Sequence, residues 1–271
     1  MNIKKVYYID ILERFLFGKK SASYIQLCKN HNLFLILRSI AEAAHPSRGG
    51  GCFAANSTVM TSEGTKKRLS DLQIGDEVVV VDTATGDLSF SPVITFLDRD
   101  PKEKRQFYVI TTETGQKLTL TPTHLVYSTS GGNDIEDITS INEVNIDEES
   151  SDLTSFEAVY AKDIQEGDLL LVQNSRGQVR PARVSTVEMR VLTGVYAPLT
   201  SMGNLVVDNI VASCYAVVDS QWVAHTAFAP LRLLNSIWPQ NNKVIEGVHW
   251  YANSLYSLAE YVMPRHLAAA P

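Results

Sequence analysis

Two stretches of this sequence repeat one another and decide its fold. The first reads Asp-Leu-Gln-Ile-Gly-Asp at 71–76 and continues as Val-Val-Val-Val at 78–81. The second reads Asp-Ile-Gln-Glu-Gly-Asp at 163–168 and continues as Leu-Leu-Leu-Val at 169–172. Short apolar runs beside glycine-containing turns are typical of short buried β-strands. The chain therefore carries two copies of one β-rich unit, about 90 residues apart.

Each copy then continues in the same order. A glycine-containing turn follows, at 85–87 and at 176–178, and a β-branched segment comes next, at 93–95 and at 184–187. Glycine and aspartate before a strand are common, so turn chemistry alone could mimic a repeat. The matched order of three features favours a duplication. It predicts an all-β domain of pseudo-two-fold symmetry over residues 52–218.

Composition and charge narrow the class of protein. The chain has 271 residues, of which 45% are hydrophobic and 20% charged, as in ordinary globular proteins. A formal net charge of −6 argues against nucleic acid as the main partner. Three cysteines are too few for a disulfide scaffold. No apolar run approaches the roughly 20 residues that a membrane-spanning helix needs.

Three segments outside the repeat differ in character. Residues 1–51 form a basic leader, in which the apolar run 33–37 is too short and too late for a convincing signal peptide. The acidic tract 133–157 holds nine Asp or Glu and no Lys or Arg, which predicts a solvated loop between strands. The tail 219–271 places aromatic and aliphatic residues at helical spacing and predicts two amphipathic helices. Packing on the β domain and contact with lipid both fit this tail, and the pattern alone favours packing.

A cysteine preceded by glycines marks the candidate reactive site. Gly49, Gly50 and Gly51 come directly before Cys52. A thiolate is a strong nucleophile, and glycine lets backbone approach backbone closely. Cys52 can therefore attack the carbonyl of Gly51 and turn the amide into a thioester. A lone cysteine is more often a small buried hydrophobe, but the glycine context favours the nucleophile.

The downstream segment Thr-Pro-Thr-His at 121–124 supplies the remaining chemistry. The departing backbone nitrogen needs a proton, and we expect His124 to donate it, because imidazole titrates nearest neutral pH. Thr121 can hydrogen-bond the strained peptide or the tetrahedral intermediate. No metal is expected, because the chain has no Cys-x-x-Cys or His-x-x-x-His pair. The sequence thus predicts cleavage of the chain's own backbone between Gly51 and Cys52.

Several motifs together resemble the C-terminal autoprocessing region of Hedgehog proteins. They are Gly-Cys-Phe at 51–53, Leu-Ser-Asp-Leu-Gln-Ile-Gly-Asp at 69–76, Thr-Pro-Thr-His-Leu at 121–125, Val-Ala-Ser-Cys-Tyr-Ala-Val at 211–217 and His-Trp-Tyr-Ala-Asn at 249–253. The resemblance implies a Hint domain over 52–218, with the all-β fold of inteins, and a sterol-recognition region over 219–271. It also implies transfer of the N-terminal fragment to cholesterol, a co-substrate, with no cofactor.

The resemblance assigns further roles. It implies that Asp98 is the base that activates the sterol hydroxyl, although a turn aspartate paired with Arg99 is the alternative. Cys214, in Ser-Cys-Tyr at 213–215, is expected on a strand near the site, where it either supports thioester chemistry or forms a disulfide with Cys52 after cleavage. The resemblance implies contact of residues 219–271 with a membrane surface. It further implies the secretory pathway and endoplasmic reticulum, then an extracellular or membrane-associated location, as for a developmental signalling protein.

Other functions stay open at this point. A Hedgehog protein carries a folded, metal-binding signalling domain before the cleavage point, whereas 51 residues precede Cys52 here. The chain is therefore expected to be a truncated or alternatively started Hedgehog, and a non-productive fragment is one alternative. A Cys/His protease that acts on other proteins is another. Splicing is not expected, because no His-Asn ending follows Cys214, so the acyl group must pass to water, a thiol or an alcohol.

Overall fold

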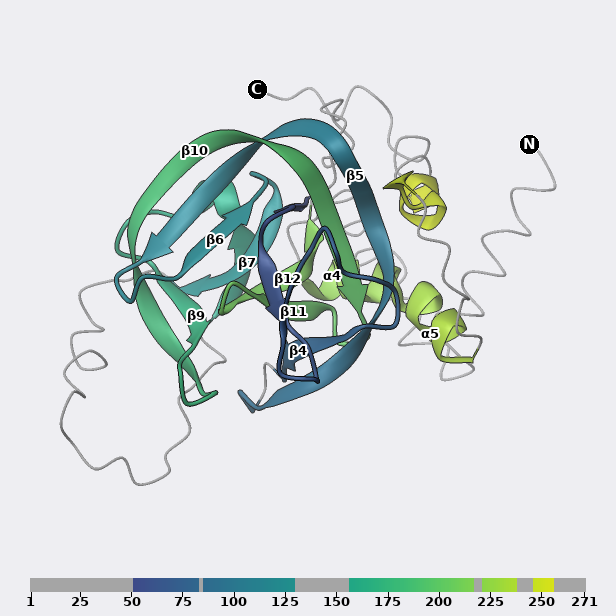
Figure 1. Cartoon of the computed structure of the whole chain (residues 1–271), viewed down its shortest axis with the longest axis horizontal. Coiled ribbons are helices and arrows are strands. Elements are labelled where there is room, and N and C mark those ends of the chain that lie inside the picture. Colours follow the sequence, from purple (N-terminus) through teal and green to yellow (C-terminus); the bar gives the residue numbers. More distant parts are fainter. Residues whose placement is uncertain (1–50, 83–84, 130–155, 217–220, 238–245, 256–271) are drawn as a thin grey trace, which may run out of the picture.

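The computed structural model describes residues 51–82, 85–129, 156–216, 221–237 and 246–255. The leader before Gly51 and almost all of the acidic tract lie outside these ranges. Within them the chain forms one 13-stranded sheet, which is antiparallel in each of its pairings (Figure 1). The predicted all-β class is confirmed.

The elements follow one another in a simple order along the chain. The strands of the domain are β1 (Phe53–Ala54), β2 (Thr58–Met60), β3 (Lys66–Arg68), β4 (Glu77–Val81), β5 (Leu88–Thr112), β6 (Lys117–Leu120), β7 (His124–Thr129), β8 (Glu157–Tyr160), β9 (Leu169–Gln173), β10 (Val179–Thr200), β11 (Asn204–Val207) and β12 (Ile210–Ala216). A short 3-10 helix, η3 (Ala161–Asp163), precedes β9. The tail adds α4 (Gln221–Ala227), α5 (Ala229–Ile237) and β13 (Gly247–Val248).

The predicted repeat is visible in the backbone. β4 pairs with β5 and β9 pairs with β10, so each apolar run forms a hairpin with the strand that follows it. Before each hairpin a glycine adopts a positive φ, 94° at Gly75 and 97° at Gly167. The Gly75 N–H donates to the Val93 carbonyl at 2.8 Å, and the Gly167 N–H donates to the Val184 carbonyl at 2.9 Å. The two copies therefore use the same turn, and the pseudo-two-fold plan is confirmed.

The strands that follow these turns are much longer than the sequence predicts. β5 has 25 residues and β10 has 22, and they pair with each other along most of their length, arching over the shorter strands (Figure 1). Four register shifts interrupt this ladder. Such irregularities bend and twist paired strands, so one strand can serve two parts of the sheet. Polar residues along β5 hide this continuity from a pattern of short apolar runs.

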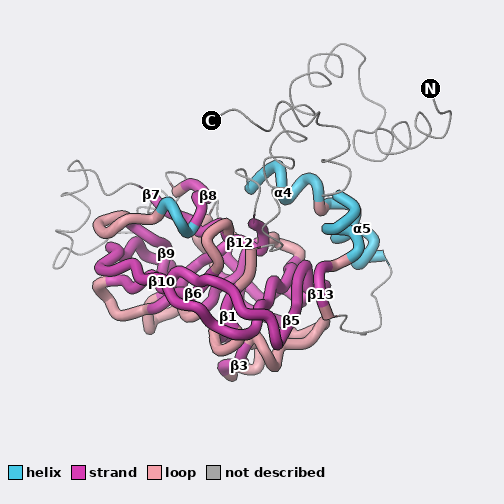
Figure 2. Tube along the Cα trace, turned by 90° about the horizontal axis from the view of Figure 1, so that it is seen from above, coloured by secondary structure: helices cyan, strands magenta, loops and turns pink. Residues whose placement is uncertain are grey.

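The tail packs on one side of the strands (Figure 2). Ala224, Phe228 and Ala252 join the main core cluster, and the Phe228 ring stacks on Tyr215 with centroids 5.5 Å apart. The predicted helices are present as α4, α5 and a helical segment over 250–255. Beyond the predicted helices, the tail adds the short strand β13, which pairs with β5. No helix in the described part of the chain is long and apolar enough to cross a membrane.

Candidate active site

The peptide nitrogen of Cys52 is held in place by Thr121. Cys52 lies directly before β1, which sits between β6 and β10, and it is fully buried. Its N–H donates to the Thr121 hydroxyl oxygen at 2.8 Å, and its carbonyl accepts from the Thr121 N–H at 2.9 Å. Thr121 thus hydrogen-bonds both the N–H and the carbonyl of Cys52. The Thr121 hydroxyl faces the nitrogen of the Gly51–Cys52 bond.

Gly51 occupies a space that no other residue fits. A Cβ atom at this position would overlap the Ala216 side chain and would lie 3.0 Å from His124 Nδ1. Glycine is therefore required here for close approach of the backbone to the imidazole. β12 forms the wall, since Ala216 pairs in register with His124.

His124 is buried with one ring nitrogen directed at Gly51. Its Nε2 lies 2.8 Å from the Ser213 carbonyl, which can only accept, so Nε2 carries the proton in the neutral ring. Its Nδ1 is buried and makes no hydrogen bond of regular geometry. Burial lowers the pKa of His124 to about 4, although the backbone carbonyl of Ser213 and the neighbouring Gly51 partly offset the drop. At neutral pH the resting imidazole is therefore neutral, with a lone pair on Nδ1.

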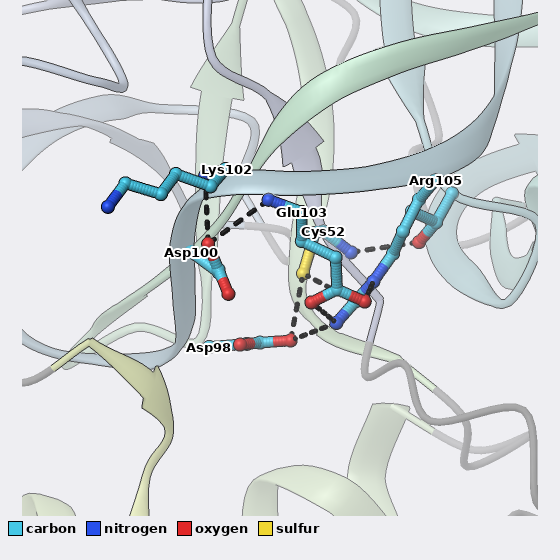
Figure 3. A network of polar contacts seen from close by, with 7 residues as sticks. Cys52, Asp98, Asp100, Lys102, Glu103 and Arg105 are labelled. Atoms are coloured by element: carbon cyan, nitrogen blue, oxygen red, sulfur yellow. Dashed lines mark hydrogen bonds and ion pairs between the residues drawn. The ribbon is translucent and has the colours of Figure 1, made fainter.

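The sulfur of Cys52 belongs to a network of charged groups (Figure 3). Cys52 Sγ lies 3.5 Å from Asp98 Oδ2, and Arg105 Nη1 donates to the same sulfur at 3.3 Å. Arg105 Nη2 donates to Asp98 Oδ2 at 2.8 Å. Glu103 holds the other side of the guanidinium, with its Oε1 2.7 Å from Nε of Arg105. Both partners of the Asp98–Arg105 ion pair are largely buried.

Burial decides the protonation states in this network. Desolvation raises the pKa of the Cys52 thiol well above its usual value; the Asp98 carboxylate raises it further, while Arg105 opposes the rise. Desolvation also raises the pKa of Asp98, and its charge and hydrogen-bond interactions with Arg105 pull that pKa down. The resting Cys52 thiol is therefore protonated. Arg105 opposes the rise in pKa of both Cys52 and Asp98.

The resemblance to Hedgehog proteins implies a role for Asp98, but nothing in the sequence points to Arg105. The alternative partner considered for Asp98, Arg99, instead donates to the carbonyls of Leu72 and Ser70, so that pairing is wrong. Arg105 ends a charged run that begins at Asp100 and reads as a solvated loop. Only the path of β5 brings it beside Cys52, and no motif in the sequence points to it.

Cys214 lies apart from the Cys52 network. It is on β12, as predicted, and its sulfur is 3.6 Å from the Thr200 hydroxyl oxygen. Burial raises its pKa to about 11. No disulfide joins Cys52 and Cys214, and the two residues belong to separate core clusters. In the uncleaved chain the two cysteines therefore lie in different parts of the core, and the role of Cys214 after cleavage stays a prediction. No group of three potential ligands that could hold a metal occurs among the described residues.

The tail reaches the site through β13. Val248 pairs in register with Asp98, and Gly247 pairs with Arg99. The His249 N–H donates to the Leu97 carbonyl at 2.8 Å, which extends the contact beyond the strand. The backbone that carries Asp98 is thus flanked by β10 on one side and by the tail on the other.

Comparison with known proteins defines the class. The family described as the Hint module matches residues 40–264, and the chain therefore belongs to the Hint family. It is 36% identical over 239 residues to Sonic hedgehog protein of Danio rerio. The aligned region covers 84% of this chain and 53% of that protein. It is also 36% identical over 231 residues to Protein hedgehog of Drosophila melanogaster, covering 79% and 45%. The resemblance to Hedgehog proteins is confirmed, and the chain spans about half the length of these relatives.

Similar solved structures are inteins. The gp41-1 intein aligns with 61% of this chain and 99% of its own, at 20% identity and a TM-score of 0.39. The Ssp DnaB mini-intein variant M86 aligns with 61% of this chain and 95% of its own, at 12% identity and a TM-score of 0.45.

Proposed function

We propose that this chain cleaves its own Gly51–Cys52 bond through a Cys52 thioester and passes the N-terminal fragment to a sterol, cholesterol. One observation carries the proposal. The nitrogen of the bond is hydrogen-bonded to Thr121, its acyl side lies against His124 Nδ1, and the sulfur contacts Asp98. Nucleophile, proton carrier and base thus surround one peptide bond. Membership of the Hint family supports the same reaction.

The first step is an N-to-S acyl shift. Cys52 Sγ loses its proton and attacks the Gly51 carbonyl carbon, a C–S bond forms, and the C–N bond breaks. The leaving nitrogen becomes an amine by taking up one proton, so the step consumes no proton overall. Thr121 positions this nitrogen because its hydroxyl accepts the nitrogen's only hydrogen. That contact directs the nitrogen lone pair away from Thr121, toward an incoming proton.

His124 carries the proton to the leaving nitrogen. Because its pKa is lowered to about 4, it starts neutral and must first accept a proton on Nδ1 before it can donate one. The sequence predicts a donor that titrates near neutrality, whereas the buried ring acts as a shuttle between thiol and amine. Proton transfer of this kind contributes about 10²–10⁴ in rate.

The second step transfers the acyl group to an alcohol. The alcohol oxygen attacks the thioester carbon, its proton passes to the Asp98 carboxylate, and the Cys52 thiolate leaves. Asp98 suits this role because it is buried beside the sulfur that carries the acyl group. A carboxylate whose pKa is raised is a stronger base than one in water. The reaction needs the sterol as co-substrate and no cofactor.

The tail supplies the surface for the sterol and for a membrane in this proposal. β13 lies directly opposite Asp98, so an apolar alcohol held by the tail enters beside the base. Large apolar side chains remain exposed on the tail, namely Trp222, Leu233, Leu234, Val248 and Trp250. Exposed aromatic and aliphatic groups of this kind suit a lipid interface. If the chain acts as Hedgehog proteins do, it follows a secretory route through the endoplasmic reticulum, and this route is part of the proposal.

The decisive test separates the two steps in the full chain. Dithiothreitol attacks the thioester without a base, whereas release by cholesterol needs Asp98. We expect Asp98→Asn to retain thiol-induced cleavage and to lose cholesterol-dependent release. Intact mass of the N-terminal fragment, with and without added cholesterol, measures both. Met189→Ala is the matched control, because Met189 lies exposed on the equivalent long strand.

Two results would overturn the proposal. Cleavage that persists in Cys52→Ala would remove Cys52 as the nucleophile. A wild-type chain that stays intact with both dithiothreitol and cholesterol would make it a non-productive fragment. Action on other proteins has no support, because the Cys52 sulfur is buried beside the chain's own Gly51.

A further inference from the structure

Arg105 contacts both groups on which the two proposed steps depend. Its Nη1 donates to Cys52 Sγ at 3.3 Å and its Nη2 donates to Asp98 Oδ2 at 2.8 Å (Figure 3). One planar, permanently charged group thus bridges the nucleophile and the base. The Arg105 side chain is only 11% exposed, so solvent screens these contacts weakly.

We propose that Arg105 couples the two steps, by stabilising the Cys52 thiolate in the first and by keeping Asp98 ionised for the second. This inference rests on the proposed function and adds a residue to it. No step passes a proton to the guanidinium, which stays charged throughout. In the first step the positive charge of Arg105 lies beside the forming thiolate and stabilises it. In the second step Arg105 keeps Asp98 ionised, so that the carboxylate can accept the proton of the alcohol.

Opposite charges meet at the Cys52 sulfur. Asp98 disfavours ionisation of the thiol, whereas Arg105 favours it, and Glu103 acts in the same direction as Asp98. The carboxylate needed in the second step would therefore hinder the first if it stood alone. Arg105 removes this conflict because its two nitrogens bind the carboxylate and the sulfur at the same time.

Few other titratable groups lie around this pair among the described residues. On β10, Ala197 pairs with Asp98 and carries no charge, and on β13 Val248 does the same. The titratable groups on the surrounding elements include His124 of β7 beside Gly51, Tyr196 of β10, whose ring faces Arg99, and Glu246 and His249 on either side of β13. The charges that act on both Cys52 and Asp98 are therefore those of Arg105 and Glu103.

The chain contains a matched control for Arg105. Arg190 on β10 also binds the glutamate two residues before it, Glu188, through Nε and Nη2. Both of these side chains are more than half exposed, and Arg190 pairs in register with Phe107 of β5. Arg190→Gln therefore breaks the same kind of local ion pair, on the other long strand, away from the sulfur.

The experiment compares pH profiles of the full chain. Thiol-induced cleavage reports the first step and cholesterol-dependent release reports the second. In Arg105→Gln we expect both profiles to move to higher pH, by about one to three pH units. Below the shifted midpoint each rate falls about tenfold per unit. Arg105→Lys should move the profiles less, because it keeps the charge, and Arg190→Gln should not move them.

A second comparison keeps the test independent of folding, since removing one partner of a buried ion pair is strongly destabilising. In Asp98→Asn and in the double variant Asp98→Asn with Arg105→Gln, position 98 carries no buried carboxylate that could lose its partner. Glu103, which also binds Arg105, is 31% exposed. The double variant should need a higher pH for thiol-induced cleavage than Asp98→Asn alone. Identical profiles in this pair, or an unshifted profile in folded Arg105→Gln, overturn the role of Arg105. Loss of cleavage in the wild-type chain or its persistence in Cys52→Ala would instead overturn the proposed function.

Discussion

The two halves of the β domain share a backbone plan and differ in chemistry. Residues 51–129 contribute the polar side chains of the site, namely Cys52, Asp98, Arg105, Thr121 and His124. Residues 156–216 contribute a main-chain carbonyl at Ser213 and the wall formed by Ala216. The duplicated turns and hairpins supply a scaffold, and one copy alone carries the reactive groups. Symmetry of the fold therefore does not extend to the site.

One pair of equivalent positions makes the difference concrete. Asp98 comes five residues after Val93 and is buried, whereas Met189 comes five residues after Val184 and is 59% exposed. Val93 and Val184 accept the same turn hydrogen bond in the two copies. Equal backbone position thus gives opposite environments, because β13 of the tail pairs with β5 at Asp98 and Cys52 lies against the Asp98 carboxylate.

The largest expected contrast is between the cysteines of the two halves. Cys52→Ala should abolish thiol-induced cleavage, because no other described thiol lies at the Gly51 carbonyl. Cys214→Ala should retain cleavage, since its sulfur contacts Thr200 in a separate cluster. A denaturing gel with intact mass measures both variants. Equal loss of cleavage in a folded Cys214 variant would break the asymmetry between the halves.

His124 and Ser213 give the next contrast, because they share one hydrogen bond across the halves. His124→Gln should slow thiol-induced cleavage by about 10²–10⁴-fold, through loss of proton transfer. Ser213→Ala keeps the carbonyl that binds Nε2 and should retain a rate close to that of the wild type. Single-turnover kinetics at pH 7 compare them. A larger defect in Ser213→Ala would assign chemistry to the second half.

Acid should destabilise the domain through the first half. His124 has a pKa of about 4 when folded and about 6.5 when unfolded, so the unfolded chain binds more protons between these values. The free energy of unfolding therefore falls as the pH drops, by roughly 2 kcal/mol between pH 7 and pH 5 from this group. Residues 156–216 contain no histidine.

Urea unfolding at the two pH values tests this slope. Cys52→Ala provides an uncleaved background. Adding His124→Gln should reduce the change in the free energy of unfolding between pH 7 and pH 5 by roughly 2 kcal/mol. His225 of the tail, whose pKa burial also lowers to about 4, leaves a residual slope in both proteins. An unchanged slope would mean that His124 is not buried in its neutral form.

The smallest expected effects are equal in the two halves. Gly75→Ala and Gly167→Ala each place a Cβ at positive φ, with no atom within 4 Å to clash. Each substitution should cost about 1–2 kcal/mol of stability from backbone strain alone. Thermal unfolding in the Cys52→Ala background compares them. A large difference between the two would show that the turns are not equivalent.

Part of the site could be predicted from local sequence. The thiol behind glycines and the Thr-x-x-His segment each lie in one short stretch, and the structure brings Cys52, Thr121 and His124 together as expected. The strand around Cys214 was also predicted, but not which way its side chain points. Arg105 had no local pattern, because it reaches Cys52 only through the path of β5.

The sequence by itself determined the turns and the apolar runs of the two copies, and it predicts the cleavage point, since these depend on neighbouring residues. Only the tertiary structure decided that Arg105 rather than Arg99 pairs with Asp98, that His124 is neutral, and that β13 of the tail lies opposite Asp98. These features depend on strand register and on burial among residues far apart in the chain. Strand register shifts whole rows of side chains, and burial sets the cost of each charge, so neither can be read from a local pattern.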